Sequence, residues 1–171
     1  SGGTWSSSNT TVATVNSSTG VVTGVAAGTS TITYTVAGTG GCSNATTTAN
    51  VTITAPRSAT IGYSAVAYCN TLTSTPAPTI IGSTGGVFSS AAGLSINSST
   101  GVVNPSASTP GTYTVKYLLA ALGGCAADSS TDDITITENP FATITYATPY
   151  CSSPTNVGTV TLNGTIGGVF S

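Results

Sequence analysis

The chain contains no histidine and almost no charge. In 171 residues it has only two basic and four acidic side chains. These are Arg57, Lys116, Asp128, Asp132, Asp133 and Glu138. Catalytic sites are assembled mostly from His, Asp, Glu, Lys and Cys placed close together. The composition therefore predicts a protein that is not an enzyme and has no catalytic residues.

Other absences narrow the range of partners and ligands. A nucleic-acid partner needs clustered Lys and Arg to neutralise phosphates, and none are clustered here. No apolar run has the length of a membrane span. The cysteines form no Cys-x-x-Cys pair and have no histidine near them, which argues against zinc. We therefore expect no nucleic acid, no membrane span, no metal site and no cofactor.

Serine, threonine and glycine are abundant where charged residues are few. Ser and Thr account for 60 of the 171 residues and Gly for 21, while 39% of the chain is hydrophobic. Such a bias is common in disordered segments. Here, however, the apolar residues follow a pattern, and Thr, Val, Ile and Tyr dominate the patterned stretches. Because these residues suit a pleated, half-buried surface, we expect folded β-structure.

Short motifs recur along the chain at intervals of about 80 residues, the size of a small all-β domain. The segment Asn-Ser-Ser-Thr-Gly-Val-Val occurs at 16–22 and again at 97–103, and its first five residues predict a hairpin loop between Val15 and Val21. Gly-Gly-Cys at 40–42 returns at 123–125, and Tyr-Cys at 68–69 returns at 150–151. The chain therefore covers about two periods of one repeating unit.

Alternating patterns within each unit predict strands with one buried face. Ile32, Tyr34 and Val36 alternate with threonines, and Tyr113, Val115 and Tyr117 alternate in the same way. Many short strands separated by turn signals predict an all-β fold in which each unit is a sandwich of two antiparallel sheets. The predicted core residues are Trp5, Tyr34, Ile53, Phe88, Tyr113, Ile136 and Phe170.

Proline-bearing junctions follow the last predicted strand of each unit. Pro56 lies in one junction and Pro140 in the other, and proline ends strand pairing. On this phase residues 58–138 form a complete domain. Residues 1–55 form the C-terminal part of a preceding repeat, and 141–171 the N-terminal strands of the next. We refer to these three ranges as the first, second and third units.

The four cysteines suit disulfides in an oxidising compartment. Cys69 lies early in the second unit and Cys125 near its penultimate strand, so we predict that these two pair. Cys42 and Cys151 would then pair with cysteines outside the chain or in neighbouring copies. A Cys42–Cys69 bridge is the main alternative, although it leaves Cys125 for Cys151 and breaks the repeat.

The segment from Trp5 to Ile32 resembles the bacterial immunoglobulin-like domain of group 2, found in invasin- and intimin-type surface proteins. The resemblance rests on Val-Ala-Thr-Val at 12–15, on Gly-Val-Val-Thr-Gly at 20–24 and on Gly-Thr at 28–29. The Tyr-Cys and Gly-Gly-Cys motifs more closely resemble giant repeat adhesins of type IX secretion, including gliding-motility adhesins. The resemblance implies an all-β fold of tandem immunoglobulin-like antiparallel β-sandwiches. It also implies a non-catalytic repeat of an extracellular stalk, adhesin or filament at the bacterial surface. Its partners would be further repeats, neighbouring copies in a fibre, and a host or environmental surface.

Other interpretations of single features remain open. A glycan- or protein-binding module of a secreted multidomain protein is the alternative function, with Trp5 as a sugar-stacking residue. The carboxylates from Asp128 to Glu138 are candidates for calcium, and Lys116 for an isopeptide bond. The Thr-x-Thr arrays at 29–35 and 46–54 are candidates for an ice-binding face.

Overall fold

The computed structural model describes residues 2–146, 148, 152 and 158–165, and these residues form almost only β-structure. The exception is one short 3-10 helix, η1 (Pro105–Ala107), and no described helix is long and apolar enough to cross a membrane. The prediction of an all-β fold is therefore confirmed. The strands are β1 (Thr4–Ser7), β2 (Ala13–Val15), β3 (Val22–Gly24), β4 (Gly28–Val36), β5 (Ala45–Ile53), β6 (Ala59–Gly62), β7 (Ala67–Cys69), β8 (Thr79–Gly82), β9 (Val87–Ser89), β10 (Gly111–Leu119), β11 (Asp128–Thr137), β12 (Ala142–Tyr146) and β13 (Val160–Gly164).

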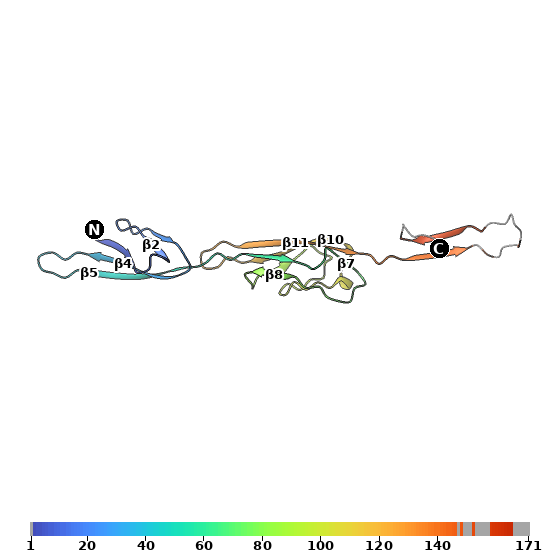
Figure 1. Ribbon diagram of the computed structural model, residues 1–171, viewed down its shortest axis with the longest axis horizontal. Coiled ribbons are helices and arrows are strands. Elements are labelled where there is room, and N and C mark those ends of the chain that lie inside the picture. Colours follow the sequence, from blue (N-terminus) through green and yellow to red (C-terminus); the bar gives the residue numbers. More distant parts are fainter. Residues whose placement is uncertain (1, 147, 149–151, 153–157, 166–171) are drawn as a thin grey trace.

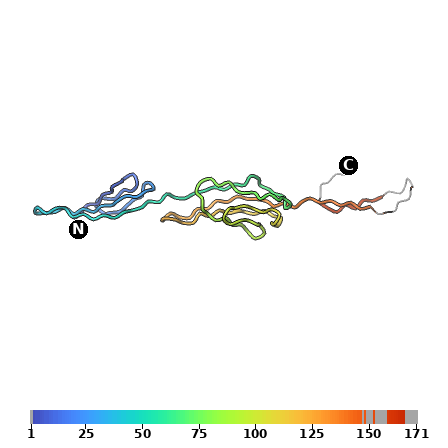
Figure 2. The backbone as a smooth tube through the Cα atoms, turned by 90° about the horizontal axis from the view of Figure 1, so that it is seen from below, coloured from blue at the N-terminus to red at the C-terminus, as the bar shows by residue number. Residues whose placement is uncertain are grey.

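The strands gather into groups that follow one another along the long axis of the molecule (Figure 1). At one end lies the sheet β1-β4-β5 together with the β2–β3 hairpin. The sheet β7-β11-β10-β9 and the β6–β8 pair form the middle group, and the β12–β13 hairpin lies at the other end. The view turned by 90° shows the same succession (Figure 2). The unit boundaries that we predicted from the junction prolines stay a prediction.

The main core lies in the middle group. Alternation along β10 places Tyr113, Val115 and Tyr117 on one buried face, as the sequence predicts, and Leu119 continues that face. Opposite them, Ile134 and Ile136 of β11 are almost fully buried. The buried members of this core are Ala59, Tyr68, Phe88, Leu94, Val103, Tyr113, Val115, Tyr117, Leu119, Ile134 and Ile136.

The repeated Asn-Ser-Ser-Thr-Gly segment forms the same turn in both places. The Asn16 side chain accepts hydrogen bonds from the backbone N–H groups of Ser18 and Thr19, at 3.0 and 2.9 Å. Asn97 accepts from the two equivalent N–H groups at 2.9 and 3.0 Å. Gly20 and Gly101 close the turns with φ of 74° and 72°, a region that only glycine adopts without strain. The predicted hairpin loop between Val15 and Val21 is confirmed.

The outer groups bury less than the alternating patterns predict. Ile32 of β4 is buried, but Val36 on the same face is 40% exposed. Ile144 and Leu162 of the β12–β13 hairpin are about half exposed. In the middle group the β6–β8 pair covers the corresponding face of β11. Among the described residues no strand takes that place beside β5, which is an edge of its sheet.

Candidate functional site

The acidic residues of β11 hold the neighbouring strand β6 in place. The Asp128 carboxylate accepts from the backbone N–H of Ala59 at 3.4 Å, and Asp132 accepts from that of Tyr63 at 2.8 Å. Between them the Ser130 hydroxyl accepts from the backbone N–H of Ile61 at 3.2 Å. We call these three contacts the β6–β11 seam. In the seam the side-chain oxygens of β11 are used as hydrogen-bond acceptors, and these bonds keep the sandwich closed.

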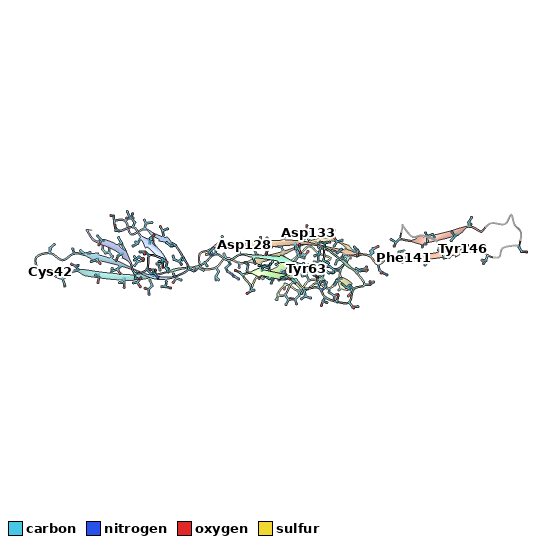
Figure 3. The ribbon with its side chains drawn as sticks, viewed as in Figure 1. Cys42, Tyr63, Asp128, Asp133, Phe141 and Tyr146 are labelled. Atoms are coloured by element: carbon cyan, nitrogen blue, oxygen red, sulfur yellow. The ribbon has the colours of Figure 1, made fainter. Side chains whose placement is uncertain are left out.

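Asp133 lies on the other face of β11, because successive side chains of a strand point to opposite sides. Its carboxylate accepts from the Thr114 hydroxyl at 2.6 Å. Figure 3 shows Asp128 and Asp133 at separate positions along the strand. The described part of the chain contains no group of three or more His, Cys, Asp or Glu side chains that could hold a metal ion. The calcium interpretation therefore finds no gathered set of ligands there.

Tyr63 connects the β6–β11 seam to the recurring turn that Gly101 closes. Its phenolic O–H donates to the carbonyl oxygen of Gly101. Burial raises the pKa of Tyr63 well above its usual value, and the neighbouring Tyr68 and Asp132 raise it further. The phenol therefore stays protonated and keeps its role as a hydrogen-bond donor. This tyrosine is a fastening between two segments of the second unit.

In the first and second units an aromatic residue packs on a tyrosine. The rings of Trp5 and Tyr34 have centroids 4.6 Å apart and planes inclined by 40°, and Phe88 and Tyr117 show the same values. Phe88 is 2% exposed, whereas Trp5 is half-buried. The tyrosine O–H groups accept from Gly3 N–H at 3.1 Å and from Gly86 N–H at 2.8 Å. The Trp5 ring is thus engaged in packing, which weakens its case as a sugar-stacking surface.

The remaining predicted core residues divide between buried and half-buried positions. Tyr113 and Ile136 belong to the main core, and Ile53 is half-buried at the end of β5. Phe170 lies outside the described residues. Lys116 is exposed and its cross-strand neighbours are Ser89 and Thr131, which offer neither a carboxyl nor an amide for an isopeptide bond.

The predicted Cys69–Cys125 disulfide is wrong for this structure. Both thiols are free, as is that of Cys42, while Cys151 lies outside the described residues. Cys69 is in register with Thr137 at one end of β11, and Cys125 precedes Asp128 at the other end. Ten residues of strand separate the ends by roughly 30 Å. A disulfide needs Cα atoms within about 7 Å.

The alternative Cys42–Cys69 bridge is also absent. Cys42 lies at the tip of the β4–β5 hairpin, at the outer end of the first unit (Figure 3). Cys69 lies at the far end of the second unit, where β7 pairs with the last residues of β11. The sequence correctly predicted that Cys69 lies early in the second unit and Cys125 near its penultimate strand. It could not show that β7 pairs in parallel with the last residues of β11, which puts Cys69 far from Cys125.

Cys125 instead lies at the junction between the first and second units. Its turn is closed by two backbone hydrogen bonds between Leu122 and Cys125, at 3.0 and 3.3 Å. The Cys125 thiol lies 3.4 Å from the carbonyl oxygen of Thr54, the residue that follows β5. A side chain at Gly123 would collide with the Thr54 side chain. Sequence reasoning missed this contact, because the Gly-Gly-Cys motif alone does not name its partner.

The sheets, the aromatic pairs and the recurring turn define an all-β protein whose packing is consistent with immunoglobulin-like β-sandwiches. Residues 1–49 match the family model of the bacterial Ig-like domain (group 2), which confirms the predicted resemblance over that stretch. Domains of this family are generally non-catalytic and occur in bacterial surface and extracellular proteins. No curated protein matches the chain in sequence.

Proposed function

We propose that this chain is a non-catalytic repeat segment of a long extracellular stalk, adhesin or filament at the bacterial surface. The observation that carries the proposal is the recurrence of one set of contacts about 80 residues apart. The Asn16 and Asn97 turns, the two aromatic pairs and the two Gly-Gly-Cys hairpins each have the same local structure. Units that repeat their own packing suit a mechanical role in which each unit extends the next.

The chemistry of the second unit supports the same proposal. Asp128, Asp132 and Tyr63 are all engaged in internal hydrogen bonds. Their partners are backbone groups of the same unit, so they fasten strands together. In this proposal the partners of the chain are further repeats of its own kind, and a host or environmental surface lies at the end of the stalk.

Electron microscopy of the protein isolated from its own cells tests the proposal. We expect a thin rod or fibre much longer than it is wide, and surface labelling of intact cells by an antibody raised against residues 58–138. Compact particles, or labelling only after cell lysis, would contradict it.

A glycan array separates this function from that of a sugar-binding module. We expect no reproducible binding, because the Trp5 ring packs on Tyr34. Binding that is kept by Trp5→Phe and lost in Trp5→Ala would overturn the structural role in favour of recognition. The Trp5→Phe variant is the matched control, since Phe88 occupies the equivalent place in the second unit.

A further inference from the structure

The chain contains the end of the first unit, at Thr54, and the end of the second unit, at Thr137, and the two can be compared. Val-Thr-Ile-Thr at 51–54 ends the first unit, and Ile-Thr-Ile-Thr at 134–137 ends the second. Thr54 and Thr137 are therefore equivalent residues. The contacts of Thr54 show which residues of the following unit lie at a junction. The contacts of Thr137 show which residues of the preceding unit lie there.

The preceding unit brings a cysteine to this residue. Cys69 of β7 is in parallel register with Thr137. The next backbone N–H, that of Asn70, donates to the carbonyl oxygen of Thr137 at 2.8 Å. The carbonyl of Thr137 therefore points toward the Cys69–Asn70 segment, and the two strands lie about 5 Å apart.

The following unit also brings a cysteine, and it lies beside the equivalent residue, Thr54. The Cys125 thiol lies 3.4 Å from the carbonyl oxygen of Thr54, the equivalent of the oxygen that Asn70 binds. The glycine at 123 permits this close approach, with φ of 59° and no side chain to meet Thr54. Cys125 therefore stands on the side of Thr54 where the preceding unit's own Tyr-Cys strand would run.

We infer that a disulfide crosses each junction, joining the Tyr-Cys cysteine of one unit to the Gly-Gly-Cys cysteine of the next. The inference rests on the proposed function, because it needs successive units of this kind. Cys69 would pair with the hairpin of a following unit, and Cys125 with the Tyr-Cys strand of a preceding one. Cys42 is the Gly-Gly-Cys cysteine of the first unit and, like Cys125, would pair with the Tyr-Cys cysteine of a preceding unit.

The placement explains why no pair forms within the described residues. Cys69 and Cys125 face opposite junctions of one unit, so each needs a partner from a different neighbour. The bond would tie together strands that only the short segment of Pro56 or Pro140 otherwise connects. A line of units closed in this way transmits tension through covalent bonds on two paths at each junction.

Formation of the bond is a two-electron oxidation. The two thiols lose two protons, a sulfur–sulfur bond forms, and the electrons reduce the disulfide of a thiol–disulfide oxidoreductase to two thiols. The Thr71 hydroxyl hydrogen-bonds the Cys69 sulfur at 3.1 Å and lowers the pKa of that thiol. Since the thiolate is the nucleophile, the lowered pKa favours attack by the Cys69 sulfur.

Disulfide mapping of the protein from its own cells is the first test. Free thiols are blocked with N-ethylmaleimide during lysis, and trypsin then cuts after Arg57 and Lys116, which separates Cys69 from both Cys42 and Cys125. We expect the Cys69 fragment to be joined to a Gly-Gly-Cys peptide of another unit. A Cys69–Cys125 bond within one unit, or complete labelling of both thiols, would overturn the inference.

The same sample distinguishes the two sources of the neighbouring unit. A partner peptide from the same polypeptide leaves the size on a non-reducing gel unchanged by dithiothreitol. A partner from a second copy gives a ladder that collapses to one band on reduction. Either result supports the junction bond.

An engineered pair tests the geometry in the 171-residue chain itself. In a Cys42→Ser, Cys151→Ser background, Thr54→Cys should form a disulfide with Cys125 on mild oxidation, joining fragments 1–57 and 117–171. The control is Thr52→Cys, whose side chain lies beside Thr29 and about 7 Å further along the strand. It should leave Cys125 at least tenfold more open to labelling than Thr54→Cys does.

A third variant checks the other side of the junction. Thr137→Cys should join Cys69, its neighbour in register, and Thr54→Ser should keep the circular dichroism spectrum of the parent chain. A folded Thr54→Cys variant whose Cys125 labels as freely as that of the control would overturn the inference. Fibres without a junction bond would leave the proposed function standing, whereas compact particles that carry the bond would contradict only that function.

Discussion

The indole ring of Trp5 packs on the phenol ring of Tyr34, with centroids 4.6 Å apart and an interplanar angle of 40°. In the second unit the rings of Phe88 and Tyr117 repeat this arrangement with the same separation and tilt. The two pairs differ in burial, since Phe88 is buried and Trp5 is half-buried. The same ring contact should therefore contribute differently to the stability of the two units.

Removal of each aromatic ring should show this difference. We expect Phe88→Ala to lower the free energy of unfolding by about 3–5 kcal/mol, as for a buried phenylalanine. Trp5→Ala should cost about half as much or less, because its ring keeps part of its contact with water in the native state. Urea unfolding followed by circular dichroism measures both. Equal losses would contradict the difference in burial.

Trp5 also provides a probe confined to the first unit, because it is the only tryptophan. Phe88→Ala should move the transition seen by circular dichroism and leave the tryptophan fluorescence transition within about 0.5 kcal/mol of the parent. If both signals move together, the two units unfold as one cooperative body.

Gly101 should tolerate no side chain. Its φ is 72°, and an added Cβ would lie 2.7 Å from both the Phe88 ring and Pro78. We expect Gly101→Ala to lower the free energy of unfolding by about 2 kcal/mol or more, since backbone strain and overpacking add. Gly62→Ala is the matched control, because nothing lies within 4 Å of its added Cβ. A neutral Gly101→Ala would show that the turn can rearrange.

Much of the fold follows from patterns that the sequence displays openly. Alternation of Tyr113, Val115 and Tyr117 with polar residues predicted the buried face of β10. The Asn-Ser-Ser-Thr-Gly segment predicted the loop after Val15, and the same segment forms the same turn at Asn97. These features are local, since each depends on residues only a few positions apart. The match of residues 1–49 to the bacterial Ig-like domain (group 2) was predictable for the same reason.

Features that depend on which strands become neighbours were not predictable. The order β7-β11-β10-β9 places Cys69 and Cys125 at opposite ends of β11, and no local pattern shows that β7 runs parallel to β11. The β6–β11 seam was missed because Asp128 and Asp132 look like solvated residues of a strand end. One signal was available: Asp128, Ser130 and Asp132 alternate, so they share one face.

Asp132 should contribute more to stability than Asp133, although the two are adjacent. Asp132 accepts from the backbone N–H of Tyr63, whereas Asp133 accepts from the hydroxyl of Thr114, an exposed residue. We expect Asp132→Ala to cost about 1–3 kcal/mol, the effect of leaving an amide without its acceptor. Asp133→Ala should cost less than about 0.5 kcal/mol. Asp132→Asn keeps an acceptor oxygen and should recover most of the loss. Equal effects at the two positions would contradict the seam.

The final prediction concerns alkaline pH and Tyr63. Its pKa is raised in the folded state by burial and by its neighbours, while in the unfolded chain it titrates near 10. Above pH 10 the unfolded state therefore binds fewer protons than the native state, and stability falls as pH rises. Below that pH the contribution of Tyr63 is fully present.

Urea unfolding at a series of pH values from 8 to 11 measures this effect by comparison with Tyr63→Phe. At pH 8 the variant should be less stable by about 1 kcal/mol, because its ring cannot donate to the Gly101 carbonyl. The gap should narrow above pH 10, since only the parent chain carries the shifted phenol. Tyr146→Phe, at an exposed ring, is the control at pH 8, where it should leave the stability of the parent chain unchanged. A gap that stays constant to pH 11 would mean that Tyr63 ionises equally easily in the folded and unfolded states, and that its burial does not hold the proton.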